Sequence, residues 1–154
     1  MAAVPGGLAD PSAADAASCS GWSCAGKDPS AAGCTGNETI GWHWNIEFRV
    51  SSTCDAAWAR YKNPSADDVR DSGTMYCIYS TNYSKQWLDT RNIPAGKYYG
   101  IVQQECIQVS LGLWTKMVTG KYLRICEQPV NVANPPRSGS GCSKYNQIKT
   151  NPYA

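Results

Sequence analysis

Residues 41–50, with the sequence GWHWNIEFRV, carry the clearest structural pattern of the chain. Apolar and polar side chains alternate at every position from Trp42 to Val50. This period of two predicts one half-buried β-strand, because a helix would distribute the same side chains around its circumference. The prediction places on the core side Trp42, Trp44, Ile46, Phe48 and Val50. It places on the solvent side His43, Asn45, Glu47 and Arg49.

Other strand-like segments follow this stretch along the chain. Residues 74–80 and 97–110 are rich in β-branched and aromatic side chains, which is typical of strands. Gly100 is expected to mark a bulge or bend in the second of them. Residues 54–62 form either another strand or one helical turn, and Trp58 is expected to pack into the core.

The remaining pattern completes an all-β prediction. Residues 113–127 are expected to form a hairpin with its turn near Thr119 and Gly120. Because helical patterns are scarce, we predict an all-β fold, a small disulfide-stapled sandwich or barrel with extended arms. The expected parts are an N-terminal arm at 1–18, a β domain at 19–128 and a C-terminal arm at 129–154.

Cysteine is the strongest compositional signal, with eight residues in the chain. They are Cys19, Cys24, Cys34, Cys54, Cys77, Cys106, Cys126 and Cys142. An even number at irregular spacing in a loop-rich chain predicts four disulfides formed in an oxidising compartment, and leaves the pairing open. Cys142 is expected to tether the C-terminal arm. The alternative is a zinc site, although such sites favour C-x2-C pairs and only Cys19-x4-Cys24 comes close.

Charge and hydropathy exclude several function classes. The formal net charge is +2, and no cluster of Lys or Arg indicates binding to nucleic acid or to an anionic membrane. No apolar run approaches the roughly 20 residues that span a bilayer. The first residues do not resemble a signal peptide. We expect a secreted, extracellular protein whose signal was removed and replaced by Met1, with release by lysis as the alternative.

Few residues indicate catalysis or metal binding. His43 is the only histidine, so a Ser–His–Asp or Cys–His system would need it. A solvated surface histidine is the simpler interpretation. Asp67, Asp68 and Asp71 are candidate calcium ligands, but their spacing favours a solvated acidic turn. We therefore expect no enzymatic activity, no cofactor and no metal.

Aromatic residues indicate a binding surface. The chain has six Trp and nine Tyr against one Phe, and the polar atoms of Trp and Tyr suit interfaces and sugar stacking. The candidates for an exposed partner-binding surface are Tyr61, Tyr83, Trp87, Tyr98 and Tyr145. The alternative is a division of these rings between the core and scattered surface positions.

Three segments resemble a known family. They are the region Cys19–Cys34 with its GKDP, the stretch IEFRVSSTCDAAWAR at 46–60 and WTKMVTGKYLRIC at 114–126. Together they are similar to a family of secreted actinomycete domains of unknown function. Its members carry a C-x-G-x-x-C segment with G-K-D-P, a strand ending in C-x-A-A-W-A-R and a late Y-T-x-M-V.

The resemblance covers residues 19–127, and the chain departs from it in an insert at 63–106 and an arm beyond Cys142. More specifically, the chain resembles the adaptor subunit of the umbrella-shaped antibacterial toxin particles that actinomycetes secrete. This resemblance implies a non-enzymatic adaptor in a hetero-oligomeric extracellular complex. It also implies an N-terminal arm that docks in a cleft of a lectin-bearing, protease-like partner, through which glycan is contacted indirectly.

The N-terminal arm supports a partner on physical grounds. Residues 1–18 have only Val4 and Leu8 as sizeable apolar side chains. Ordering such a segment costs on the order of 17–34 kcal/mol of backbone entropy, while burial of two side chains recovers about 3–6 kcal/mol. Backbone hydrogen bonds in a partner's groove can supply the difference, and Pro5 and Pro11 favour an extended course. The partner-binding residues expected in the arm are Val4, Pro5, Leu8 and Pro11.

These observations favour a secreted adaptor or scaffold. The alternatives are a stand-alone module that binds cell-wall polysaccharide or another glycan, a virion or filament decoration protein, and an enzyme or enzyme inhibitor.

Overall fold

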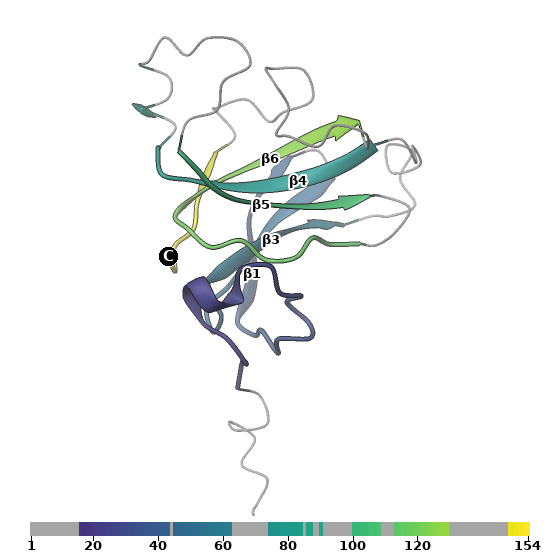
Figure 1. Ribbon diagram of the computed structural model, residues 1–154, viewed down its shortest axis with the longest axis vertical. Helices are drawn as coiled ribbons and strands as arrows, with labels where there is room; N and C mark the ends of the chain where they lie inside the picture. The colour runs from purple at the N-terminus through teal and green to yellow at the C-terminus, as the bar shows by residue number, and fades with distance from the viewer. Residues whose placement is uncertain are drawn as a thin grey trace, which may run out of the picture.

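A computed structural model describes residues 16–43, 45–62, 74–84, 86–87, 90, 100–108, 113–129 and 148–154 of the chain. Within them the protein is built mainly of two antiparallel sheets, with the short 3₁₀ helix at 21–24 and helical residues at 86–87, which confirms the all-β prediction (Figure 1). The described residues contain no helix that is long and apolar enough to cross a membrane. The calcium-ligand candidates Asp67, Asp68 and Asp71 lie outside the described residues.

The first sheet has three strands in the order β1-β2-β3. They are β1 (Asn37–His43), β2 (Ile46–Ser51) and β3 (Ala56–Tyr61). The 3₁₀ helix η1 (Gly21–Cys24) precedes them. The second sheet has four strands in the order β5-β4-β6-β7. They are β4 (Thr74–Thr81), β5 (Ile101–Gln108), β6 (Tyr122–Pro129) and β7 (Lys149–Thr150).

The stretch 41–50 forms a hairpin and not one strand, so that part of the prediction was wrong. β1 ends at His43, and β2 begins opposite it at Ile46. Residues directly opposite each other in an antiparallel pair share a face of the sheet. In β1 the polar positions of the alternation therefore lie on the face that the apolar positions occupy in β2. His43, predicted to face solvent, is therefore buried with Ile46, and Trp42, predicted to be in the core, is 42% exposed.

The β2 half of the alternation was predicted correctly for its apolar side. Ile46, Phe48 and Val50 are buried, and Trp58 of β3 is buried as expected. Glu47, predicted to face solvent, is only 4% exposed because it lies under an ion pair described below. Trp44 lies outside the described residues.

The core lies between the two sheets. The first sheet contributes Ile46, Phe48, Val50, Ala57, Ala59 and Tyr61, and the second contributes Tyr76, Ile78, Leu123 and Ile125. Val118 packs with them. Burial of apolar side chains of this size contributes about 1.5–3 kcal/mol each, so this shared core is the main force that joins the sheets.

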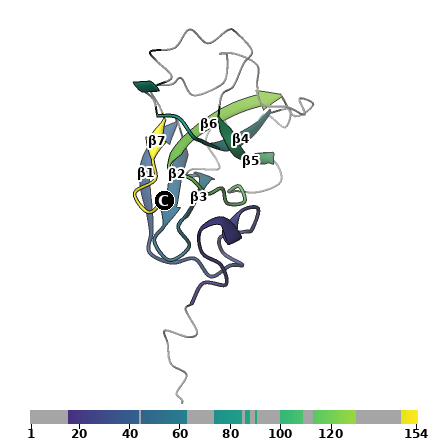
Figure 2. The same cartoon turned by 60° about the vertical axis from the view of Figure 1, so that its left-hand side comes forward.

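The two sheets are also joined along their edges. Residues 114–118 pair with β3 through Arg60 opposite Trp114 and Ala57 opposite Val118. The chain then continues into β6, which pairs with β4, so the predicted hairpin at 113–127 does not form. At the other side β7 pairs with β6 and lies beside β1 (Figure 2). This second connection by the C-terminal residues was not predicted.

The predicted strands at 74–80 and 97–110 correspond to β4 and β5, and the segment 54–62 contains a strand, β3, and no helical turn. Gly100 has a positive φ of 67°, and the register between β4 and β5 shifts beside it. Gly100 therefore forms a bend immediately before β5, in line with the predicted bulge or bend, while the extra residue of the register shift is Val102. The edges of the predicted strand at 97–99 and 109–110 lie outside the described residues.

Three disulfides are present in the described residues: Cys19–Cys24, Cys34–Cys54 and Cys77–Cys106. Cys126 is also disulfide-bonded, and Cys142 lies outside the described residues. The first two bridges fix the irregular segment before β1, whereas the third joins two strands that are already paired. Disulfides of this kind are compatible with an extracellular protein.

Candidate functional site

The segments that carry the family resemblance form one structural unit. The backbone of Gly26 and Lys27 exchanges hydrogen bonds with Met117: Gly26 N donates to Met117 O and Met117 N donates to Lys27 O, each at 2.9 Å. Thr115 N in turn donates to Ala59 O of β3 at 2.9 Å. Residues far apart in sequence thus form a continuous layer from the cysteine-rich segment to the first sheet.

The side chain of Asp28, in the GKDP sequence, joins two parts of this unit by hydrogen bonds. Its Oδ2 accepts a hydrogen bond from Ala31 N at 2.8 Å, and its Oδ1 accepts one from the Trp114 indole N–H at 2.8 Å. Pro29 is buried beside it. Gly26 adopts a φ of 75°, a conformation that favours glycine. The GKDP sequence is therefore explained by local geometry: it shapes a turn and orients Trp114.

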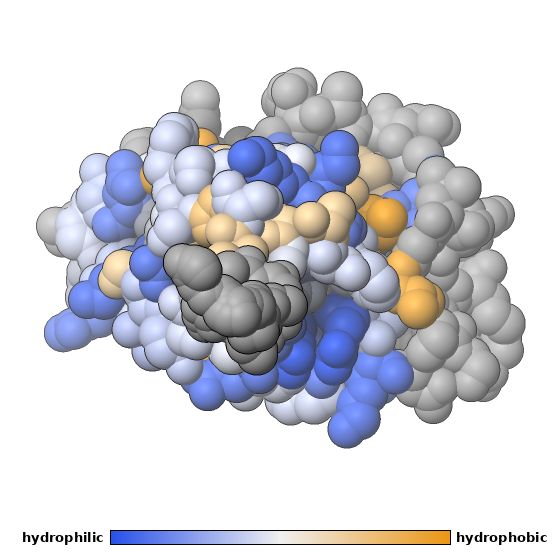
Figure 3. Space-filling view, turned by 90° about the horizontal axis from the view of Figure 1, so that it is seen from below, coloured by the Kyte–Doolittle hydropathy of each residue, from blue (hydrophilic) through white to orange (hydrophobic). Residues whose placement is uncertain are grey.

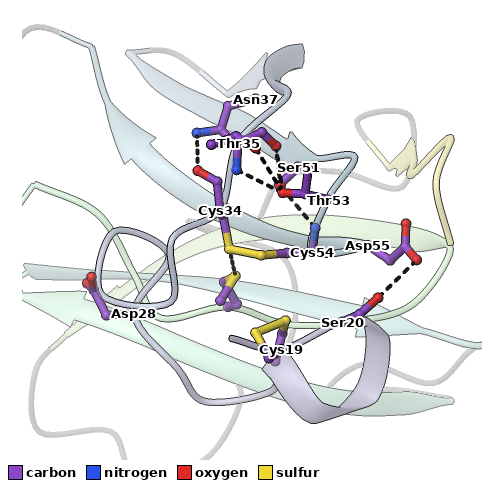
Figure 4. Close-up of a disulfide and its surroundings, with 12 residues drawn as sticks. Cys19, Ser20, Asp28, Cys34, Thr35, Asn37, Ser51, Thr53, Cys54 and Asp55 are labelled. Atoms are coloured by element: carbon purple, nitrogen blue, oxygen red, sulfur yellow. Dashed lines mark hydrogen bonds between the residues drawn. A yellow bond between two sulfur atoms is a disulfide. The ribbon is translucent and has the colours of Figure 1, made fainter. Parts of the chain in front are cut away.

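A cluster of sulfur atoms lies beneath this turn (Figure 4). The Sγ atoms of Cys19, Cys34 and Cys54 lie within 4.8 Å of one another, and the Cys34 Sγ is 3.5 Å from the Met117 Sδ. Such clustering is also found in metal sites, but zinc binds thiolates. All three of these cysteines are in disulfides, so the cluster is a buried covalent anchor.

The outer face of the first sheet carries a polar network. Thr39 Oγ1 donates to Glu47 Oε1 at 3.0 Å, and Arg49 Nη1 donates to Thr39 Oγ1 at 3.0 Å. Arg60 Nε forms an ion pair with Glu47 Oε2 at 2.6 Å. Burial lowers the pKa of Arg49, and the neighbouring positive charge of Arg60 lowers it further, while Glu47 opposes both effects. Arg60 thus contacts the Glu47 carboxylate directly, whereas Arg49 is linked to it through the Thr39 hydroxyl.

A groove of about 320 Å³ opens between this face and the turn that follows Asp28. Its lining includes Trp58, Arg60, Trp114, Asn37 and Ser30. Trp58 is only 3% exposed, so it contributes a floor, while Trp114 is half-buried. The groove combines aromatic walls, one partly exposed cation and small polar groups, a composition common in small-ligand sites.

A second hollow, of about 570 Å³, also has Trp114 in its lining. Asp28, Glu105, Leu113 and Lys116 contribute to its lining. Burial raises the pKa of Glu105, and Lys116 partly opposes that shift. Because the Asp28 carboxylate is engaged by two N–H groups, the pair Asp28 and Glu105 does not resemble the free acid–base pair of a glycosidase.

The structure distributes the predicted partner-binding residues among different environments. Tyr61 is buried in the core, where its ring packs edge-on against Tyr76 at 5.2 Å, so the prediction that it is exposed was wrong. Tyr83 and Trp87 are half-buried and stack on each other with ring centroids 3.8 Å apart. The remaining candidates Val4, Pro5, Leu8, Pro11, Tyr98 and Tyr145 lie outside the described residues.

The large hydrophobic side chains that the structure exposes are not among the partner-binding residues predicted from the sequence. Seen from below, the described surface is mostly hydrophilic with small hydrophobic patches (Figure 3). The large exposed hydrophobic side chains of the described residues are Trp22, Trp42, Val102 and Leu113. Trp22 has the highest exposure, 66%. Its position between two closely spaced cysteines was the available signal, because a short disulfide loop holds its central residues at the surface.

Comparisons of the chain with protein-family models, curated proteins and solved structures found no match.

Proposed function

We propose that this chain is a secreted, non-enzymatic adaptor that binds other protein subunits of an extracellular particle through its N-terminal segment and the adjoining η1 turn. The observation that carries the proposal is the presentation of Trp22. Its side chain is 66% exposed on a turn closed by the Cys19–Cys24 disulfide. Tryptophan is enriched among the residues that dominate protein interfaces, so a rigidly presented indole is a suitable anchor.

The η1 turn is pre-organised for binding. Ser20 N donates to Ser23 Oγ, and Ser23 Oγ donates to Ser20 O, each at 2.9 Å. Gly21 N donates to Cys54 O at 2.7 Å, which ties the turn to the loop between β2 and β3. A partner that contacts Trp22 therefore has little chain entropy to remove, and this raises affinity.

Residues 16–18, the described end of the N-terminal segment, directly precede this turn. Ser18 N donates to Ala32 O at 2.8 Å, and a Cβ atom at Gly33 would lie only 3.5 Å from the Ala16 carbonyl oxygen. The last residues of the segment are thus held against the turn that contains Asp28. A partner bound along residues 1–15 would reach Trp22 as a continuation of the same interface.

The resemblance noted from the sequence supports an extracellular toxin particle as the proposed assembly. The three family-like segments pack as one unit, as expected if they were retained together as a scaffold. On this basis the proposed partner is a lectin-bearing, protease-like subunit of an antibacterial toxin particle, with the N-terminal segment in its cleft. His43 is buried and Asp28 serves as an anchor, and both observations favour an adaptor over an enzyme.

Affinity capture from the culture supernatant of the native host tests this proposal. The full chain, residues 16–154 and the Trp22→Ala variant are compared, with Trp42→Ala as a matched control at another exposed tryptophan. We expect the full chain and the control to recover the same large partner, identified by mass spectrometry. Both the truncated chain and Trp22→Ala should lose most of it. Equal recovery of that partner by all four proteins would refute the proposed interface.

A further inference from the structure

The groove beside the first sheet has the features of a ligand site separate from the Trp22 surface. It is assembled from the turn after Asp28, from β1, from β3 and from Trp114. Its volume of about 320 Å³ lies at the lower end of the range for small-molecule sites. This size fits a single ring with its substituents and is too small for a folded segment.

The charge of the groove favours an anionic ligand. Arg60 lies in the lining, and its side chain is 38% exposed while that of Glu47 is 5% exposed. The ion pair with Glu47 engages Arg60 Nε and leaves the terminal amino groups outside that contact. Arg49 lies on the next strand of the same face, where its Nη1 donates to Thr39 Oγ1 and adds a second positive charge near that of Arg60. A ligand carboxylate in the groove could accept hydrogen bonds from the terminal amino groups of Arg60.

The walls of the groove favour a sugar ring. Trp58 forms an apolar floor, and the Trp114 indole is fixed in orientation by its hydrogen bond to Asp28. The amide of Asn37 and the hydroxyl of Ser30 lie at the exposed rim, where they can bind hydroxyl groups. An apolar surface bordered by amide and hydroxyl groups complements the apolar face and the polar edge of a sugar.

The strand pairing disfavours an acidic peptide as the ligand. Recognition of an extended peptide usually uses a free strand edge that supplies backbone hydrogen bonds. At the groove both edges of β3 are occupied, because Arg60 lies between Glu47 of β2 and Trp114. Ala57 is likewise flanked by Val50 and Val118.

We propose that the groove binds a carboxylate-bearing sugar, with Arg60 pairing with the carboxylate and Trp114 contacting the sugar ring. Asn37 and Ser30 bind the hydroxyl groups. This site does not depend on the adaptor role, because it uses neither Trp22 nor the N-terminal segment.

Calorimetric and NMR titrations of the full chain test the site with matched sugar pairs. N-acetylmuramic acid is compared with N-acetylglucosamine, and glucuronic acid with glucose, at one fixed salt concentration. We expect the acidic member of at least one pair to bind about tenfold more tightly than its neutral counterpart, as a charge-assisted pair implies. The indole N–H signals of Trp58 and Trp114 should shift, whereas that of Trp22 should not.

Variants locate the binding. Arg60→Gln should abolish the preference for the acidic sugar, while Lys121→Gln, which removes a positive charge outside the groove, should retain it. Arg60→Lys keeps a positive partner for Glu47, and it replaces Arg60→Gln in the experiment if that variant does not fold. It should weaken the preference because it lacks the planar pair of amino groups. Three outcomes would each overturn the proposal. They are equal binding of acidic and neutral sugars, absence of sugar binding, and binding of N-acetylated glutamate amide, an acidic peptide analogue, instead of the sugars.

Discussion

The two sheets of this protein use disulfides in different ways. Before the first sheet, the Cys34–Cys54 bridge joins the end of an irregular segment to the loop between β2 and β3. In the second sheet, the Cys77–Cys106 bridge joins residues that already face each other across two hydrogen-bonded strands. In the first region the covalent link replaces a hydrogen-bond ladder that the segment lacks, whereas in the second it reinforces one.

This difference explains where binding surfaces are found. An irregular segment held by disulfides can present side chains such as Trp22 that a regular strand would direct into a ladder or a core. The groove, the η1 turn and the base of the N-terminal segment all adjoin this region. Loops on a rigid scaffold are the usual location of binding residues, and here the rigidity is largely covalent.

The largest effect on local opening is expected from removal of the bridge in the first region. Cys34→Ala/Cys54→Ala should lower the free energy of unfolding by about 3 kcal/mol, because the bridge closes a loop with a sequence separation of 20. Urea unfolding measures this loss. Amide exchange in residues 26–36 should also accelerate, since the segment belongs to no strand ladder that would hold it in place of the bridge.

The matched variant Cys77→Ala/Cys106→Ala tests whether removal of the bridge in the second sheet has a different local effect. The sequence separation of 29 gives a global loss of similar size, about 3–4 kcal/mol. Amide hydrogens in β4 and β5 should nevertheless exchange only through global unfolding, because the strand hydrogen bonds persist and prevent local opening. Local loosening of β4 and β5 that matches the loosening of residues 26–36 would contradict the proposed distinction.

A smaller effect is expected at the contact that joins the turn to Trp114. Asp28→Asn replaces one carboxylate oxygen by an amino group, so one of two N–H donors loses its acceptor. The free energy of unfolding should fall by about 1–2 kcal/mol, and the tryptophan fluorescence should change as Trp114 loses its fixed orientation. Asp55→Asn is the matched control. Its carboxylate accepts only a long hydrogen bond from Ser20, and Asn tolerates its positive φ.

If the control is destabilised as much as Asp28→Asn, the loss reflects charge alone and Asp28 has no special anchoring role.

The sequence predicted the parts of this fold that depend on local periodicity. The alternation at Ile46, Phe48 and Val50 correctly indicated a strand with a buried apolar side. It failed at Trp42 and His43, because no Gly or Pro marks the turn between β1 and β2 and the period of two continues through it. Periodicity cannot detect a turn that leaves the alternation of apolar and polar residues unchanged.

The candidate site was less predictable because it depends on long-range contacts. Asp28 and Trp114 are separated by 86 positions, and their hydrogen bond leaves no local signal. The segment at 113–127 looked like a hairpin, but its first part pairs with β3 and its second with β4. Only the complete topology places Arg60 beside Trp114 and creates the groove.

The smallest expected effect concerns Glu105 in the second hollow. Burial raises the pKa of this carboxyl above its ordinary value of 4.5, so the folded chain binds the proton more readily than the unfolded chain. The stabilising contribution of the protonated group is therefore complete below that ordinary value and is lost as the pH rises through the raised pKa. Glu105→Gln should remove this loss, so its melting temperature relative to that of the unmodified protein should increase with pH.

Thermal unfolding between about pH 4 and pH 7 measures this difference, which cancels the contributions of the other titrating groups. The increase should not exceed about one or two degrees, because Glu105 is only partly buried, so solvent still screens its charge, and Lys116 stabilises its charged form. A relative melting temperature that falls with pH would mean that the Lys116 attraction outweighs burial at Glu105. The second region would then stabilise its buried charge by ion pairing, as the first region does at Glu47.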